Sequence, residues 1–239
     1  MGEATPESYC LMHVGKTGDG SIKALISAHR RRHRSAPIRA FGHHFVLPIL
    51  RERFPQHQVV FFVRDPVARY VSGFNSRLRQ GRPKNDRPWT PQEEVAFRRF
   101  PTPNSLAEAL SSTDAGCRAQ AEQSMNDISH VQTPLRAFVG SFAFLQQCVA
   151  EGSIAMIGTM QYFAEDVARM QRIVGLDPDL SLPTDDLRTH RTPAGMETRL
   201  SEEGERNIRA WYRADYEIYG WCMQRREEWS AATVPDGGG

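Results

Sequence analysis

The chain has 239 residues, of which 40% are hydrophobic and 24% are charged, values close to those of soluble globular proteins. This length suits one α/β domain, with a core large enough to need neither disulfides nor metal. The formal net charge of +2 is too small to indicate nucleic-acid binding, although it is compatible with a small anionic ligand. No apolar run approaches the roughly 18 residues that a membrane span needs.

The cysteines lie far apart, at positions Cys10, Cys117, Cys148 and Cys222. No two of them have the spacing of a metal site or a redox motif, so we expect reduced thiols. Residues 1–8 are polar and acidic, unlike a signal peptide. We therefore expect a cytoplasmic protein that uses no metal and has no membrane or nucleic-acid partner.

The chain begins with a pattern that predicts a strand, a glycine loop and a helix. Residues 9–14 form a short apolar run typical of a buried strand. A loop with three glycines follows, at Gly15, Gly18 and Gly20. Residues 22–32 then repeat apolar side chains at helical spacing.

Later segments continue the alternation of strands and helices. We predict strands at 59–63 and 153–157, helices at 45–54, 67–79, 105–112, 116–129 and 164–174, a loop at 177–195, and a long helical region at 201–229. Residues 80–104 are rich in Pro, Arg and Asn, which indicates a long loop that serves as a lid or binds an acceptor. The pattern predicts a doubly wound α/β fold with a central, mostly parallel sheet flanked by helices.

The first glycine loop has the chemistry of a phosphate site. Backbone N–H groups next to Gly15, Gly18, Asp19 and Gly20 can approach an anion, and the helix that follows adds a positive dipole. Side-chain donors come from Lys16, Thr17 and Ser21. The loop lacks the first glycine of a nucleotide-triphosphatase P-loop, because that position holds Cys10.

A second anion site is predicted where the strand at 59–63 ends. Ligands of open α/β sheets gather at the carboxyl ends of the strands, where Arg64 stands. The planar guanidinium suits a phosphate, and Ser72 lies two turns along the next helix. We expect Arg69 to face solvent or to pair with Asp65.

Together the two segments resemble the PAPS-dependent sulfotransferases, whose donor is 3′-phosphoadenosine-5′-phosphosulfate (PAPS). Residues 12–18 (MHVGKTG) are similar to the family's 5′-phosphosulfate loop, and residues 61–72 (FFVRDPVARYVS) to its 3′-phosphate motif. Weaker similarity to the family extends to residues 156–159 and 215–219. Within the family, the chain most resembles compact bacterial members. The resemblance implies a P-loop-like sulfotransferase fold over residues 1–239.

The resemblance also implies a mechanism. A sulfuryl group passes in line from PAPS to a hydroxyl or amine of a small-molecule or carbohydrate acceptor, leaving adenosine-3′,5′-bisphosphate, and no metal is needed. Lys16 would stabilise the leaving phosphate, while Arg64, Ser72 and a late loop with Arg191 would bind the bisphosphate.

The base is expected among two adjacent histidines. The pair Gly42-His43 is similar to the uronosyl 2-O-sulfotransferase branch, whose histidine serves as base. His44 is the alternative, because adjacent side chains of an extended segment point to opposite faces. The chain departs from the family at Asp19, a carboxylate in an anion loop, and at Gly20, where a hydroxyl residue is frequent. Phe41 replaces a further histidine of the 2-O branch, so uronosyl specificity does not carry over.

Two alternatives stay open. A P-loop kinase-like phosphotransferase would need Mg²⁺ and an acidic ligand at a strand end, for which Asp65 is the candidate. A non-catalytic protein that binds adenosine bisphosphate or polyanions could use the basic run 29–34 (HRRRHR).

Overall fold

The computed structural model describes residues 8–83, 85–182 and 195–231. The chain divides into two compact units. The first comprises Met1–Arg64, Leu135–Pro183 and Glu217–Gly239, and the second comprises Asp65–Pro134 and Thr184–Tyr216. Arg191 and most of the loop predicted at 177–195 lie outside the described residues.

The first unit contains a sheet of parallel strands. The strands are β1 (Tyr9–Leu11), β2 (Ile38–Ala40), β3 (Gln58–Val63) and β4 (Ile154–Thr159). Their order is β2-β1-β3-β4, and every neighbouring pair is parallel. The predicted α/β fold with a parallel sheet is therefore confirmed.

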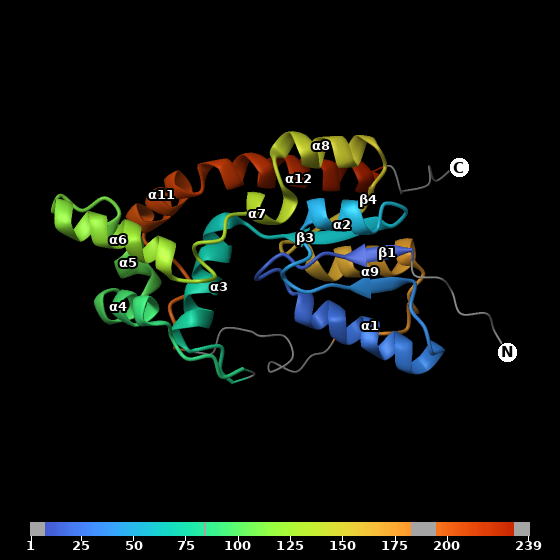
Figure 1. The fold of residues 1–239 in the computed structure, drawn as a ribbon, viewed down its shortest axis with the longest axis horizontal. Coiled ribbons are helices and arrows are strands. Elements are labelled where there is room, and N and C mark those ends of the chain that lie inside the picture. Colours follow the sequence, from blue (N-terminus) through green and yellow to red (C-terminus); the bar gives the residue numbers. More distant parts are fainter. Residues whose placement is uncertain (1–7, 84, 183–194, 232–239) are drawn as a thin grey trace, which may run out of the picture. The chain divides into compact units, whose positions relative to one another are not determined.

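Helices cover both faces of this sheet: in Figure 1 α1 lies below the strands and α8 and α12 lie above them, and α9 shares one core cluster with α1. The helices of this unit are α1 (Asp19–His33), α2 (Leu47–Arg53), α7 (Arg136–Val139), α8 (Phe142–Ala150), α9 (Phe163–Val174) and most of α12 (Arg213–Ala231). Alternation along β3 explains the two layers: Val60 and Phe62 pack with α1 and α9, whereas Val59, Phe61 and Val63 pack with the other helices.

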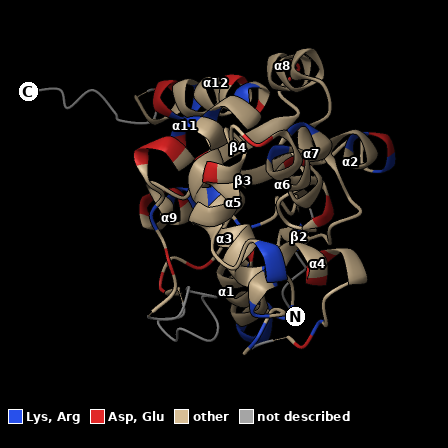
Figure 2. Ribbon diagram, turned by 90° about the vertical axis from the view of Figure 1, so that its left-hand side faces the viewer, with Lys and Arg blue, Asp and Glu red and all other residues tan. Residues whose placement is uncertain are grey.

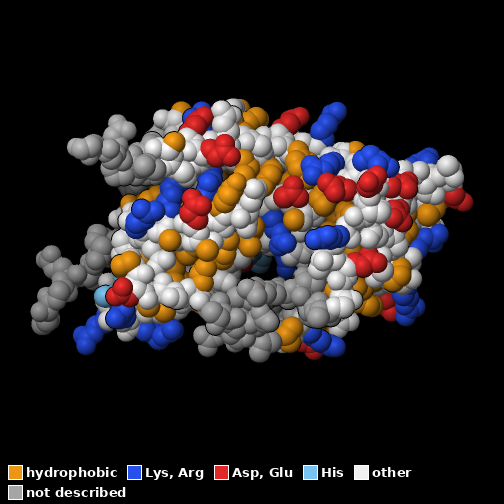
Figure 3. Space-filling view, turned by 180° about the vertical axis from the view of Figure 1, so that it is seen from behind, with side chains coloured by type: hydrophobic (Ala, Val, Ile, Leu, Met, Phe, Trp, Pro, Cys, Tyr) orange, Lys and Arg blue, Asp and Glu red, His pale blue; other side chains and the backbone are white. Residues whose placement is uncertain are grey.

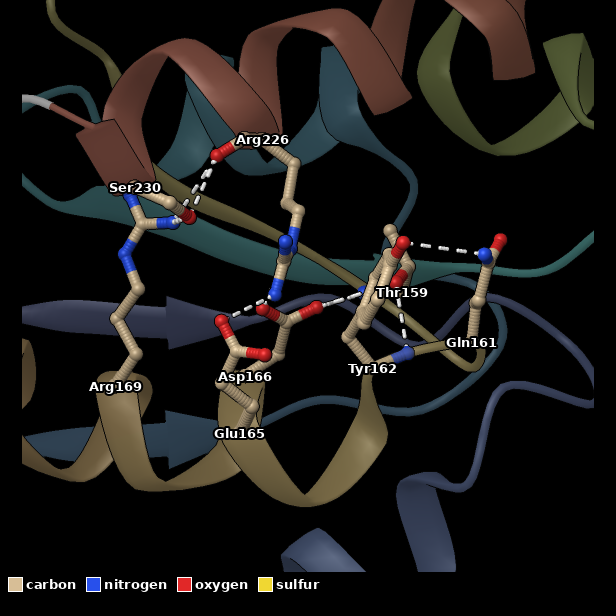
Figure 4. A network of polar contacts seen from close by, with 8 residues as sticks. All are labelled: Thr159, Gln161, Tyr162, Glu165, Asp166, Arg169, Arg226 and Ser230. Atoms are coloured by element: carbon tan, nitrogen blue, oxygen red, sulfur yellow. Dashed lines mark hydrogen bonds and ion pairs between the residues drawn. The ribbon is translucent and has the colours of Figure 1, made fainter.

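A buried ion network joins α12 to α9 and β4 (Figure 4). Asp166 has no exposed surface and accepts hydrogen bonds from the backbone N–H of Thr159 at 2.7 Å and from Arg226 Nε at 2.9 Å. Arg226 also stacks on the ring of Tyr162 and pairs with Glu165. Both helices carry acidic and basic residues (Figure 2), and Arg226 of α12 pairs with Glu165 and Asp166 of α9.

The second unit is helical. It contains α3 (Pro66–Leu78), α4 (Pro91–Arg99), α5 (Pro103–Ala109), α6 (Ala115–Asp127), α11 (Glu202–Trp211) and the start of α12. These helices share one apolar core that includes Phe74, Phe97 and Leu106. Arg69, expected to face solvent or to pair with Asp65, is instead buried, donates to the carbonyl of Thr133 and lies 3.4 Å from Asp215.

Some elements differ from the sequence predictions. The segment 80–104 is not a loop throughout, because α4 occupies Pro91–Arg99, and Thr90 and Glu93 form a capping box at its start. The strand β2 and the helices α7 and α8 were not predicted. The role of 80–104 as a lid or acceptor-binding segment stays a prediction.

A buried ion pair fixes this segment to α3. Arg77 binds Glu93 with two hydrogen bonds, Nε to Oε1 at 2.7 Å and Nη2 to Oε2 at 2.5 Å. Glu93 also accepts from Ser129 and from the backbone N–H of Thr90. Burial would raise the pKa of the Glu93 carboxyl, but the hydrogen bonds from Arg77, Thr90 and Ser129 lower it from 4.5 to about 2.

This pair predicts a pH-dependent contribution to stability. Because the folded-state pKa is depressed, the contribution is fully present above about pH 4.5 and is lost as the pH falls toward 2. Glu93→Gln should lower the free energy of unfolding at pH 7 by about 3–5 kcal/mol, since it leaves Arg77 buried and uncompensated. Urea unfolding at several pH values measures this, and the difference from wild type should shrink below pH 4.5.

The neighbouring Glu94 provides the matched control, because it pairs with Arg98 at 2.6 Å on the exposed side of α4. Glu94→Gln should cost about 0.5 kcal/mol or less. Equal losses for the two variants would show that the Arg77–Glu93 pair does not anchor the segment.

Candidate active site

The strand order brings three sequence-predicted segments to one edge of the sheet. From β1 the chain passes to β2 on one side, and it then returns to β3 on the other side of β1. The carboxyl ends of β1 and β3 therefore lie at the point where the order reverses, which is where open α/β sheets bind ligands. The predicted phosphate-binding loop at residues 14–21, called the phosphate loop below, follows β1, while Arg64 follows β3 and Gly42-His43 follows β2.

The phosphate loop turns sharply between β1 and α1. Lys16 and Gly18 both adopt the left-handed conformation, with φ of 70° and 77°. A Cβ at Gly18 would lie 2.7 Å from Phe163 Cζ and 3.1 Å from Met160 Sδ, so both backbone and space require glycine there. Residues after β4 thus pack directly against the loop.

The loop leaves the amino end of α1 open to an anion. Side-chain oxygens cap α3, α4, α5, α6, α8 and α11, whereas α1 has no side-chain cap at Gly18, and α2, α7 and α9 have none either. The first backbone N–H groups of a helix have no partner within it, so those of Asp19 and Gly20 are suited to an anion.

The two hydroxyl residues of the loop are both buried. Thr17 Oγ1 donates to the carbonyl of Val14 at 2.7 Å, and Ser21 is 4% exposed in the first turn of α1. The hydroxyl hydrogen of Thr17, expected to bind phosphate, therefore stabilises the loop. Its backbone N–H is the group that suits an anion.

Arg64 is linked directly to the phosphate loop. Its Nη1 donates to the carbonyl oxygen of Lys16 at 3.3 Å. The guanidinium that sequence analysis assigned to a second anion site is thus next to the first one. Ser72 lies on α3 in the second unit, so its assignment to the 3′-phosphate stays a prediction.

The carboxylate of Asp19, unexpected in an anion loop, is compensated within the first unit. Asp19 Oδ2 lies 2.5 Å from His13 Nδ1 and 2.8 Å from Lys23 Nζ. Burial would raise the pKa of this carboxyl, but the contacts with His13 and Lys23 outweigh burial and hold the pKa well below its usual range. Asp19 is therefore ionised, and its charge is balanced locally.

The two candidate bases occupy a turn rather than an extended segment. The backbone N–H of Phe45 donates to the carbonyl of Gly42 at 3.1 Å, so His43 and His44 are the central residues of this turn. Both are exposed. The ring of His43 meets the ring of His13 edge to face, with centroids 3.8 Å apart and planes at 83°. This contact connects His43 to the phosphate loop.

The sequence analysis did not identify His13 as a site residue. It is 6% exposed, immediately precedes the loop, and contacts both Asp19 and His43. No local pattern reveals this, because His43 is brought to His13 by pairing of β1 with β2, a strand of only three residues.

Other chemically suggestive residues have structural partners. In the basic run 29–34, His29 is buried and its Nδ1 accepts from the backbone N–H of Asp177, while Arg32 and His33 both bind the Asp177 carboxylate. Asp65 caps α3 through Ala68 and accepts from the Tyr216 hydroxyl at 2.9 Å.

Within residues 8–83, 85–182 and 195–231, no three His, Cys, Asp or Glu side chains are grouped so that they could hold a metal ion. In the same ranges, no helix has the length and apolar character that a membrane crossing requires.

Comparison with known proteins agrees with this geometry. No curated protein matches the chain. A family model described as the sulfotransferase family matches residues 11–221, which include the phosphate loop, Arg64 and both units. Because the match covers most of the 239 residues, the chain belongs to the sulfotransferase family.

Proposed function

We propose that residues 1–239 act as one PAPS-dependent sulfotransferase domain that modifies a hydroxyl or amine of a small-molecule or carbohydrate acceptor. The observation that supports this best is the hydrogen bond from Arg64 to the Lys16 carbonyl, which joins the two anion-binding segments. A donor with phosphates at both its 5′ and 3′ positions needs two such segments close together. Membership of the family supports the transfer of a sulfuryl group.

The residues of the first unit fit such a donor. Glycine at position 18 and the open end of α1 offer backbone N–H groups, and Lys16 and Arg64 supply positive charge. The donor supplies an activated sulfuryl group, and its phosphate gains negative charge as the sulfur–oxygen bond breaks. The ammonium of Lys16 is the group proposed to stabilise that charge.

His43 is proposed to accept the acceptor's proton. The acceptor oxygen or nitrogen forms a bond to sulfur, the electron pair of the broken bond leaves with the bisphosphate, and the proton passes to the His43 imidazole. Exposure of His43 lets an acceptor reach it, and its contact with His13 holds it beside the phosphate loop.

The alternatives have less support. For a kinase, the candidate metal ligand is Asp65. Both of its carboxylate oxygens already accept a hydrogen bond, one from the backbone N–H of Ala68 and one from the Tyr216 hydroxyl. For a polyanion binder, part of the basic run 29–34 is bound to Asp177. On the face in Figure 3, basic and acidic side chains of the described residues lie interspersed, which does not favour a polyanion.

The direct test is transfer of label from [³⁵S]PAPS to a panel of sugars, phenols, amines and peptidic metabolites. The proposal expects a labelled product and release of adenosine-3′,5′-bisphosphate without added Mg²⁺. Transfer from labelled ATP with Mg²⁺, and none from PAPS, would instead establish the kinase.

The first prediction from the proposed function concerns Lys16. Lys16→Ala should lower kcat by about 10²-fold or more at saturating PAPS, because it removes one charge that acts on the leaving group in the transition state. Steady-state rates with the best acceptor of the panel measure this. Exposed Arg31 on α1 is the control, and Arg31→Ala should keep the wild-type rate. A Lys16→Ala rate equal to that of the control would refute the role.

The second prediction concerns Arg64. Arg64→Ala should weaken the binding of adenosine-3′,5′-bisphosphate by about 1.5–3 kcal/mol, a value typical of hydrogen bonds to a charged group. Binding of adenosine-5′-phosphosulfate, which lacks the 3′-phosphate, should change little. Calorimetry with both ligands distinguishes the roles: equal losses would mean that Arg64 only supports the loop through the Lys16 carbonyl.

The third prediction concerns the base. His43→Ala should remove most turnover while leaving the affinity for adenosine-3′,5′-bisphosphate intact, because the base acts on the acceptor. His44→Ala, the adjacent control, should be milder. If His44→Ala is inactive and His43→Ala is not, the base is His44. If both stay active, neither histidine is the base.

A further inference from the structure

His13 is a buried histidine whose surroundings the proposed function does not explain. Its side chain is almost enclosed, yet neither ring nitrogen makes an aligned hydrogen bond. Buried polar atoms normally have such partners, so an exception calls for a reason. The Nδ1 side of the ring is nevertheless held by a close contact, because Nδ1 lies 2.5 Å from Asp19 Oδ2.

His13 also contacts His43, the candidate base. The rings of His13 and His43 meet edge to face at 3.8 Å between centroids, so the two side chains are in direct contact. Because His43 lies in an exposed turn, its ring needs a fixed neighbour to keep one orientation. His13 is one such neighbour, and Asp19 contacts His13 in turn.

We propose that Asp19 and His13 are positioning residues that hold the His43 imidazole ready to accept the acceptor's proton. This inference rests on the proposed function. The proton moves only from the acceptor to His43, and neither Asp19 nor His13 exchanges one. Asp19, the carboxylate that departs from the family's loop pattern, thereby supports removal of the acceptor's proton.

The surroundings of the His13–Asp19 pair differ from those of another histidine–aspartate pair in the first unit. A second histidine–aspartate pair lies at the other end of the same helix, where His33 Nε2 is 2.9 Å from Asp177 Oδ2 and the His33 side chain is 45% exposed. The side chain of His13 is only 7% exposed, so the histidine of the His13–Asp19 pair is the more deeply buried of the two. His33 is thus a matched control.

A double-mutant cycle tests the inference. His13→Asn should lower kcat about 10–100-fold, the typical loss when a partner that orients a functional histidine is removed. In a His43→Ala background the same change should cost nothing further, because His13 acts through His43. If the kcat losses of the two single variants instead multiply in the double variant, the inference is overturned. His33→Asn should leave kcat unchanged.

Asp19→Asn provides a second, independent variant. It should also lower kcat about 10–100-fold. It should not weaken the binding of adenosine-3′,5′-bisphosphate, because it removes a negative charge beside an anion site. A parallel loss of bisphosphate affinity would show that Asp19 only maintains the loop. This would overturn its positioning role.

A spectroscopic measurement needs neither donor nor acceptor. In ¹H–¹³C NMR spectra of the protein alone, the His43 Cε1–H resonance should move in both Asp19→Asn and His13→Asn, and it should stay in place in His33→Asn. An unmoved resonance in the first two variants would overturn the inference while leaving the proposed function intact. If wild type transfers no label from PAPS to any acceptor, the proposed function fails, and the inference with it.

Discussion

The order of the parallel strands is the constraint on which the candidate site depends. Because β2 and β3 pair with opposite sides of β1, the segments after all three strands emerge at one edge of the sheet. None of these segments is itself regular structure, yet each is fixed by a short run of ladder hydrogen bonds. The Arg64 bond to the Lys16 carbonyl and the His13–His43 contact are direct consequences of this order.

Charge balance within the loop is the second determinant. An anionic donor would be repelled by a bare Asp19, but this carboxylate lies against His13 and Lys23. Lys16, the residue proposed to stabilise the leaving group, lies in this same loop. Buried charges elsewhere are balanced in the same way, as with Asp166 and Arg226 in the first unit. These pairs hold the helices that keep the sheet edge in place.

Much of the fold and part of the site could be predicted from the sequence. Apolar periodicity and glycine placement identified β1, β3, β4 and the phosphate loop, because long buried runs and turns have strong local signals. The strand β2 was missed because three residues give no periodicity. The helix α4 was missed because its prolines were interpreted as loop residues, although Pro91 stands in the first turn, where proline is favoured. The role of His13 could not be predicted, since its contacts depend on strand order.

The most direct test of the central claim is calorimetric titration of the wild-type protein with adenosine-3′,5′-bisphosphate and, separately, with ATP and Mg²⁺. A site that pairs the phosphate loop with Arg64 should bind the bisphosphate without metal and more tightly than ATP with Mg²⁺. Tight binding of ATP that depends on Mg²⁺, with no binding of the bisphosphate, would contradict the account.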